Sequence, residues 1–286
     1  MIQTQTTKLL DTDDARASEA LVGPAWLAEH LDDPDLRVIE VDVSPAAYDD
    51  WHIDGAQLWN IYADLKDGDY RTVDRSAIEA LASRCGIGPE STVVFYGYAP
   101  ALGVWLLNLY GHTDARILNC SRETWRAEGR PWNTAATPPA PTSRTLPQAE
   151  GKLRADLSEV EAEIGRRGVA LVDVRSEAEY RGERFWPSGG MQPDGRAGHI
   201  PGAIHQPVDD LYQPDGSFRT AADLRRHFSA VGLAGDDELV LYCTIGGRAA
   251  TAWFVLSRLL GRDRVRVYDG SWAEWGRTPS APVEVS

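Results

Sequence analysis

The stretch Leu239-Val-Leu-Tyr-Cys-Thr-Ile-Gly-Gly-Arg248 predicts a buried strand that runs into a cysteine-containing loop. Its first four residues form a short apolar run of strand formers, which is typical of a buried strand. Between residues 249 and 260, apolar side chains recur at helical spacing and predict a helix directly after the loop. The free N–H groups and the dipole at the start of a helix stabilise an anion. We therefore expect Cys243 to react as a nucleophilic thiolate.

The residues that follow Cys243 favour this interpretation. Gly246 and Gly247 allow the loop to bend so that several amides point inward, and Arg248 adds a positive charge at its end. The alternative is a cysteine that is merely packed in the core, which is the commoner role of a lone cysteine. A Gly-Gly-Arg sequence at the start of a helix is not needed for packing.

Outward from this stretch, strands alternate with helices. Such alternation predicts an α/β fold in which mostly parallel sheets are flanked by helices. In the first half of the chain, the expected helices and strands are 24–31, 36–43, 76–83, 91–96, 99–110 and 115–119.

The pattern occurs twice, so we interpret the chain as two copies of one domain. The matching segments keep the same order: 39–44 with 171–175, 52–56 with 199–203, 68–72 with 216–220, 85–96 with 231–242 and 119–125 with 269–275. Prolines without apolar periodicity predict an extended linker between the copies. The predicted organisation is a tail (1–17), a first domain (18–133), a linker (134–151) and a second domain (152–286).

The repeat separates residues that the fold needs from residues that carry chemistry. Cys243 is matched in the first copy by Gly97, which is followed by neither a thiol nor a basic residue. The first copy is therefore predicted to be inactive. His199 is matched by His52 and is interpreted as a structural residue. The same reasoning assigns Trp272 and Trp275 to core packing, since Trp125 matches the latter.

Composition and charge limit the partners and the cellular location expected for this protein. The chain has 286 residues and a net charge of -14, which disfavours nucleic acid and anionic membranes as partners. An anionic substrate then needs a local positive pocket. The three cysteines are widely spaced and show no metal-ligand pattern, so no metal site is expected. Cys85 and Cys120 have no neighbouring basic residues of note and are expected to be inert. A polar N-terminus without an apolar run favours the cytoplasm.

Four motifs, taken together, resemble the tandem rhodanese sulfurtransferases over residues 18–286. They are Leu171-Val-Asp-Val-Arg-Ser-Glu-Ala-Glu-Tyr180, Gly198-His-Ile-Pro-Gly-Ala203, the six-residue loop Cys243-Thr-Ile-Gly-Gly-Arg248, and Tyr268-Asp-Gly-Ser-Trp-Ala-Glu-Trp275. The resemblance implies two rhodanese-like domains, with an inactive first copy and a catalytic second copy.

The resemblance also implies a mechanism, which needs no metal or organic cofactor. A Cys243 thiolate attacks the outer sulfur of thiosulfate, keeps it as a persulfide, and passes it to a thiophilic acceptor such as cyanide or a thiol. We expect two arginines, Arg248 and Arg175, to bind the anionic donor. Asp173 is interpreted as structural, and an internal pair between Arg175 and Asp173 or Glu177 is the alternative for Arg175. The remaining candidate substrate-binding residues are those of the loop: Thr244, Ile245, Gly246 and Gly247.

Two departures from the family bear on the donor. Arg248 carries the loop's only charge, and Glu179 stands where the animal enzymes place a second arginine. A donor other than thiosulfate is therefore an alternative. A Gly/Pro-rich insert, residues 182–198, is predicted to lie over the site, where Arg184 or Arg196 could supply charge.

Three other functions remain open from the sequence. The first is a 3-mercaptopyruvate sulfurtransferase. The second is a non-catalytic binding or regulatory module. The third, a cysteine phosphatase or arsenate reductase, needs five residues between its cysteine and arginine. Only four residues separate Cys243 from Arg248, and so short a loop suits a single sulfur better than a phosphate.

Overall fold

The computed structural model describes residues 15–149 and 151–285 and contains two five-stranded sheets. Every pair of neighbouring strands within these two sheets is parallel. The first sheet has the order β1-β6-β5-β2-β4, with β1 Leu21–Val22, β2 Leu36–Asp42, β4 Gln57–Asn60, β5 Thr92–Gly97 and β6 Ala115–Leu118. The second has the order β10-β9-β11-β12-β8, with β8 Arg154–Ala155, β9 Val169–Asp173, β10 Ile204–His205, β11 Glu238–Tyr242 and β12 Val265–Tyr268.

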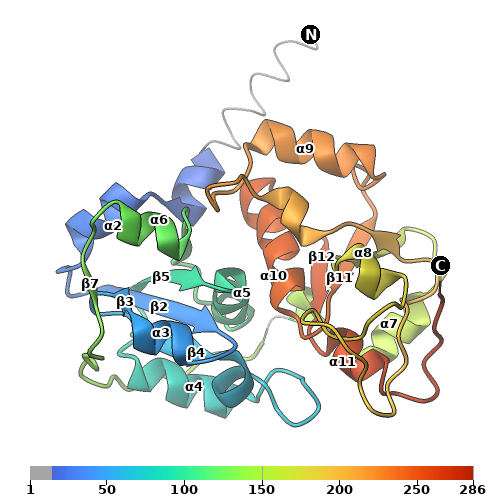
Figure 1. Cartoon of the computed structure of the whole chain (residues 1–286), viewed down its shortest axis with the longest axis horizontal. Helices are drawn as coiled ribbons and strands as arrows, with labels where there is room; N and C mark the ends of the chain where they lie inside the picture. Colours follow the sequence, from blue (N-terminus) through green and yellow to red (C-terminus); the bar gives the residue numbers. More distant parts are fainter. Residues whose placement is uncertain (1–14, 150, 286) are drawn as a thin grey trace.

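Helices flank both sheets (Figure 1). The first domain contains α2 Pro24–His30, α3 Ala46–Asp50, the π-helix η1 Ile61–Leu65, α4 Arg75–Arg84, α5 Pro100–Leu109 and α6 Arg122–Ala127. The second contains η2 Gly151–Leu153, α7 Leu157–Glu163, α8 Glu177–Tyr180, η3 Val208–Leu211, α9 Ala221–Ala230, α10 Gly247–Trp253, the π-helix η4 Phe254–Leu259 and α11 Ser271–Trp275. A small antiparallel pair, β3 His52–Ile53 and β7 Trp132–Asn133, completes the first domain. The predicted α/β class with parallel sheets is confirmed.

The two sheets have the same topology. If β1, β2, β4, β5 and β6 are matched with β8, β9, β10, β11 and β12, the strand orders coincide. In both domains a histidine stacks on a tyrosine and hydrogen-bonds its backbone carbonyl through Nδ1, at 2.8 Å: His52 with Tyr48, and His199 with Tyr180. This shared arrangement supports the structural role predicted for His199.

The helix after the cysteine loop differs from its prediction. It begins at Gly247, two residues earlier than expected, because Gly246 adopts a left-handed conformation (φ 89°) that turns the chain into the helix. The last part, Phe254–Leu259, is a π-helix. At the other end of the chain, residues 15–17, placed in the tail by sequence, are helical, whereas the rest of the predicted tail lies outside the described residues.

The predicted linker has no helix or strand from residue 134 to residue 149. It nevertheless packs along the first domain. Thr142 donates its backbone N–H to the carbonyl of Ser83, and the Leu146 side chain is buried in the core. Proline-rich chain can run extended in this way because it leaves few backbone donors to satisfy.

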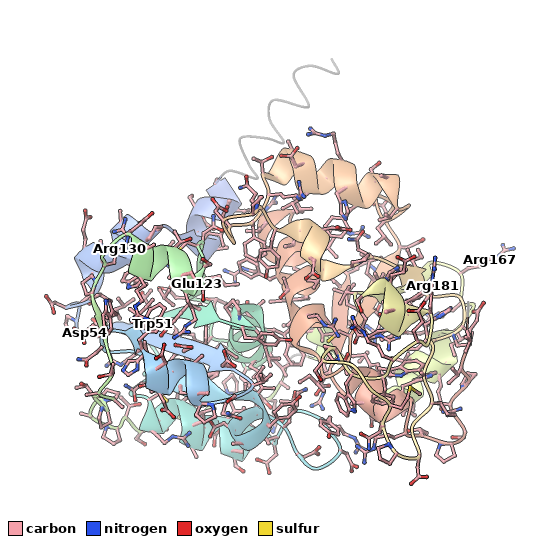
Figure 2. The ribbon with its side chains drawn as sticks, viewed as in Figure 1. Trp51, Asp54, Glu123, Arg130, Arg167 and Arg181 are labelled. Atoms are coloured by element: carbon pink, nitrogen blue, oxygen red, sulfur yellow. The ribbon has the colours of Figure 1, made fainter. Side chains whose placement is uncertain are left out.

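The two domains share a hydrophobic interface. Helix α5 of the first domain packs against α10 of the second, and one continuous core includes residues of both. Charged side chains such as Asp54 and Arg167 instead project from the outer ends of the molecule (Figure 2). The loops that precede α5 and α10 are therefore brought face to face. Among the described helices, none has the length and apolar character needed to cross a membrane.

Candidate active site

Cys243 lies at the carboxyl end of β11, the central strand of the second sheet, and its side chain is 1% exposed. Its Sγ accepts a hydrogen bond from the Gly246 N–H at 3.1 Å. Its own N–H donates to Ser271 Oγ at 3.1 Å, and its carbonyl accepts from the Trp272 N–H at 3.0 Å. The start of α11 thus fixes the cysteine backbone, while a loop amide holds the sulfur.

Gly246 and Gly247 are required by the space around the loop. A Cβ atom on Gly246 would lie 3.0 Å from the carbonyl oxygen of Asp269, and its left-handed backbone would strain any other residue. A Cβ atom on Gly247 would lie 3.3 Å from Cβ of Ala99, in the first domain. The loop is therefore pressed between α11 and the first domain.

A cavity of about 40 Å³ opens onto Cys243, which is space for little more than one water-sized group. Its walls come from both domains and from the predicted insert. They are formed by Val43, Ile61, Tyr62, Tyr98, Trp186, Pro187, Cys243, Thr244, Ile245, Gly247 and Arg248. Of the predicted substrate-binding residues, Thr244, Ile245, Gly247 and Arg248 line the cavity, and Gly246 contacts the sulfur from behind.

The first domain contributes residues that sequence reasoning did not identify. Tyr98 follows Gly97, the position that matches Cys243, and Tyr62 belongs to η1. Burial raises the pKa of both phenols, so they stay neutral at ordinary pH. The repeat could have drawn attention to Tyr98, because this residue directly follows Gly97, which matches Cys243. The packing of α5 against α10 then brings the loop after Gly97 to the wall of the cavity.

Arg248 reaches the cavity, but much of its hydrogen-bonding capacity is used inside the protein. Its two terminal nitrogens donate to the Glu179 carboxylate at 2.7 and 2.8 Å, and one also donates to Thr244 Oγ1 at 2.6 Å. Thr244 in turn donates to Glu179 Oε1 at 2.7 Å. The positive charge of Arg248 is therefore balanced by the buried carboxylate of Glu179. Glu179 is the residue that stands where the animal enzymes of the family have a second arginine.

Glu179 is fully buried at the end of α8. Burial by itself raises the pKa of a carboxyl group, but hydrogen bonds from Arg248, Ser176 and Thr244 outweigh it and lower the pKa of Glu179 to about 2. The carboxylate is thus ionised throughout the ordinary pH range and ties the active loop to α8.

Arg175 does not line the cavity. It is fully buried and forms an ion pair with Asp173 at 2.6 Å, while it also donates to the carbonyl of Gly198. Its guanidinium carbon lies 4.4 Å from the ring centroid of Trp272. This geometry corresponds to the internal-pair alternative. Because all of these partners lie within the core, the arginine holds the ends of β9 and α11 together and does not reach a donor in the cavity.

The predicted insert covers the site through apolar residues. Trp186 and Pro187 line the cavity, and the Trp186 ring lies 5.5 Å from that of Tyr70 in the first domain. Arg196 is turned away and donates to the backbone carbonyls of Trp275, Thr278 and Ala281. Arg184 donates to Ser176 Oγ at 2.9 Å and is absent from the cavity wall. Neither arginine supplies the cavity with the charge suggested from sequence.

The other two cysteines have surroundings unlike that of Cys243. Cys85 is buried and Cys120 is partly buried, and both are free thiols. Burial raises the pKa of both, to about 11 for Cys120. Such thiols are poor nucleophiles near neutral pH, as expected for inert cysteines.

Replacing Trp186 with alanine is expected to open the cavity. We predict that a bulky aromatic disulfide reagent then modifies Cys243 several-fold faster, because the indole no longer covers it. The rate is measured by the release of the reagent's chromophore. Trp132→Ala, a change of an exposed tryptophan in the first domain, serves as the control and leaves the rate unaltered. An unchanged rate in Trp186→Ala would show that other residues limit access.

Comparison with known proteins identifies the family of this chain. The rhodanese-like domain family matches residues 23–128 and again residues 156–278. A sulfur carrier protein, TtuD of Thermus thermophilus, is 39% identical over 274 residues, covering 93% of this chain and 96% of that protein. A thiosulfate sulfurtransferase of Corynebacterium glutamicum is 39% identical over 277 residues, covering 93% and 90%.

Solved structures share the architecture. The crystal structure of YnjE is 28% identical, with a TM-score of 0.79, and the match covers 94% of this chain and 68% of that one. An anaerobic ergothioneine biosynthesis enzyme from Chlorobium limicola, at 24% identity and a TM-score of 0.81, shares the fold, with 94% of this chain and 70% of that one covered. The chain belongs to the rhodanese-like family, carries its domain twice and is a rhodanese-type transferase.

Proposed function

We propose that this protein transfers a sulfane sulfur from thiosulfate, or a related small anionic donor, to a thiophilic acceptor through a persulfide on Cys243. In the first step the thiolate attacks the outer sulfur, the S–S bond of thiosulfate breaks, and sulfite leaves with the bonding electron pair. In the second step an acceptor such as cyanide or a thiolate takes the outer sulfur, and the Cys243 thiolate is restored.

One observation favours sulfur transfer over the alternative functions. The Cys243 sulfur accepts the Gly246 N–H and opens onto a cavity of about 40 Å³. That space suits one added sulfur atom. Thiosulfate needs to present only its outer sulfur to Cys243, whereas a tetrahedral phosphate or arsenate must be surrounded by the loop itself. The short loop, with four residues between Cys243 and Arg248, therefore favours sulfur transfer over the phosphatase alternative.

The pairing of Arg248 with Glu179 favours a second candidate for the donor. A neutral pair attracts a dianion such as thiosulfate less strongly than a free arginine does. 3-Mercaptopyruvate, which carries a single negative charge on its carboxylate, is therefore the donor to compare with thiosulfate.

Intact-mass measurement tests the proposal. The protein is incubated with each donor in turn, and we expect a gain of ~32 Da that a reductant removes, because one sulfur is held covalently. Cys243→Ala is expected to show no gain, whereas Cys85→Ala and Cys120→Ala keep it. The absence of an adduct with both donors would contradict the proposal and favour a binding or regulatory module.

A further inference from the structure

A buried lysine of the first domain reaches the active loop of the second. Lys66 directly follows η1, and its side chain is 1% exposed. Lysine is almost never fully buried unless it is paired. Its Nζ donates to the backbone carbonyl of Asp269 at 3.0 Å and lies 3.8 Å from the Asp269 carboxylate. The first domain, which has Gly97 at the position of Cys243, thus places a cation in the interior of the second domain.

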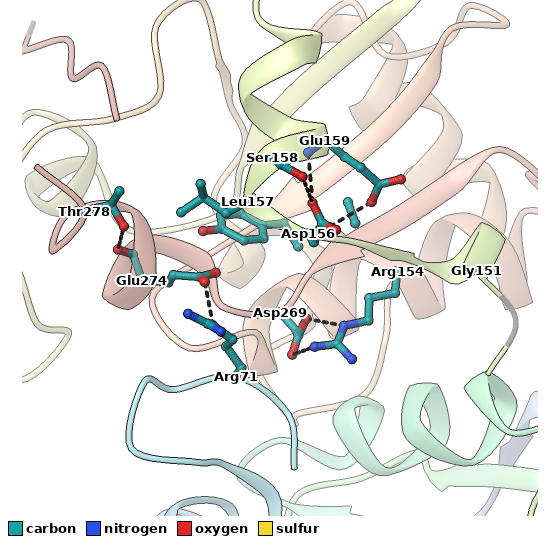
Figure 3. A pocket seen from close by; sticks show the side chains of 12 residues that line it. Arg71, Gly151, Arg154, Asp156, Leu157, Ser158, Glu159, Asp269, Glu274 and Thr278 are labelled. Atoms are coloured by element: carbon teal, nitrogen blue, oxygen red, sulfur yellow. Dashed lines mark hydrogen bonds and ion pairs between the residues drawn. The ribbon is translucent and has the colours of Figure 1, made fainter. Parts of the chain in front are cut away.

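The Asp269 carboxylate has more than one charged partner. Its carboxylate also accepts from Arg154 Nε at 2.8 Å and from the Thr72 N–H at 2.7 Å. Figure 3 shows the pairing of Arg154 with Asp269, and the separate pair of Arg71 with Glu274 beside it. Two cations, Lys66 and Arg154, face the one carboxylate of Asp269, and Asp67, next to Lys66 in the chain, exerts a weaker negative influence on the lysine.

The Lys66 ammonium packs against the residue that holds the cysteine sulfur. A Cβ atom built on Gly246 would lie 3.3 Å from Lys66 Nζ. The N–H of the same glycine donates to Cys243 Sγ at 3.1 Å. Lys66 is not part of the cavity wall. It therefore contacts the loop from outside the cavity that an incoming donor would enter.

The other ionisable groups near the sulfur provide little net positive charge. Arg248 is matched by Glu179, and Tyr62 and Tyr98 are neutral phenols because burial raises their pKa. Burial lowers the pKa of Lys66, whereas the negative charges of Asp269 and Cys243 favour its ammonium form. Thiolate formation at Cys243 and protonation of Lys66 thus support each other.

We propose that Lys66 is a positioning residue for the proposed sulfur transfer, whose ammonium stabilises the anionic sulfur of Cys243 as a thiolate and as a persulfide. This inference rests on the function proposed above. By this inference the first domain takes part in the chemistry. It has Gly97 in place of the proposed nucleophile, yet it supplies a cation that contacts the active loop. Such an arrangement requires the two domains to stay docked during the reaction.

The pH dependence of Cys243 alkylation tests the proposal without a sulfur donor. Iodoacetamide reacts with the thiolate, and peptide mass spectrometry follows the modification of Cys243 alone. Lys66→Met keeps an unbranched side chain of similar size but removes its charge, and we expect the midpoint of the pH–rate profile to rise by about one pH unit. Lys66→Arg keeps a cation and is expected to stay close to the wild-type midpoint.

A further variant separates charge from packing. Arg71→Met removes another cation that crosses the domain interface, through Glu274, but the Arg71 side chain is half exposed, so the midpoint should not move. A rise in Arg71→Met as large as that in Lys66→Met would indicate a general disturbance of the interface and would overturn the proposal.

The outcomes distinguish this inference from the proposed function. A wild-type midpoint in Lys66→Met refutes the role of Lys66, even if the wild-type protein forms a persulfide. A raised midpoint in Lys66→Met, with no persulfide in the wild type, supports the effect of Lys66 on the thiolate and contradicts sulfur transfer. Circular dichroism confirms that each variant is folded before its profile is measured.

Discussion

Replacing Cys243 with serine is expected to lower the rate of sulfur transfer from thiosulfate to cyanide by at least about 10⁴-fold, the scale on which a covalent nucleophile contributes. Serine fits the space of a side chain that is 1% exposed and can still accept the Gly246 N–H. The hydroxyl does not ionise near neutral pH and forms no persulfide. The rate is measured from the thiocyanate produced.

The control for this prediction is Cys120→Ser. Burial raises the pKa of Cys120 to about 11, so its thiol is protonated under assay conditions and turnover should be unchanged. Residual activity in Cys243→Ser close to the wild-type rate would show that another group carries the sulfur. Equal losses in both variants would indicate damage to the fold instead of loss of the nucleophile.

Replacing Glu179 with alanine is expected to have the largest effect on stability, lowering the free energy of unfolding by about 3 kcal/mol, as found when one partner of a buried ion pair is removed. The change leaves the Arg248 guanidinium without its carboxylate and frees Thr244 from α8. Sulfur transfer should fall too, because the active loop loses this anchor. Urea denaturation measures the stability.

A matched control lies on the same short helix. Glu177 pairs with Arg181, but both side chains are more than half exposed. Glu177→Ala is therefore expected to change the free energy of unfolding by about 0.5 kcal/mol or less. A similar, small effect in Glu179→Ala would contradict the anchoring role of the buried pair.

The pH dependence of stability gives a second measure of the same group. The pKa of Glu179 is about 2 in the folded protein and near its usual 4.5 when unfolded. The unfolded state therefore binds the proton more readily, so the stabilisation is complete above pH 4.5 and is lost as the pH falls toward 2. Glu179→Gln should remove this part of the acid sensitivity, which denaturation across that pH range would detect.

Much of the architecture could be predicted from sequence. The alternation of strands and helices, the internal repeat and the contrast between Cys243 and Gly97 all lie within short windows of the chain. Their physical basis is local: strand runs, helical periodicity and glycine turns are properties of neighbouring residues. The start of α10 was misplaced by two residues because the left-handed turn at Gly246 depends on the backbone of Asp269 beside it.

Sequence reasoning could not predict in the same way which charged side chains are free to bind a donor in the cavity. Arg175 follows β9 and Arg248 lies in the first turn of α10. Sequence reasoning assigned both to the donor, with an internal pair to Asp173 or Glu177 as the alternative for Arg175. In the structure Arg175 turns inward to Asp173, and Arg248 is matched by Glu179. Which way an arginine points depends on the partners that packing brings to it, and these come from other elements.

The sequence by itself determined the doubled domain and the family, and it pointed to Cys243 as the candidate nucleophile, because each is encoded in contiguous residues. Only the tertiary structure decided what surrounds Cys243: an aromatic wall from the first domain, a paired Arg248, and Lys66 beside Gly246. The physical reason is that a buried sulfur responds to the sum of nearby charges and dipoles. The packing of α5 on α10 determines which charges and dipoles lie near the sulfur, because it brings distant parts of the chain together.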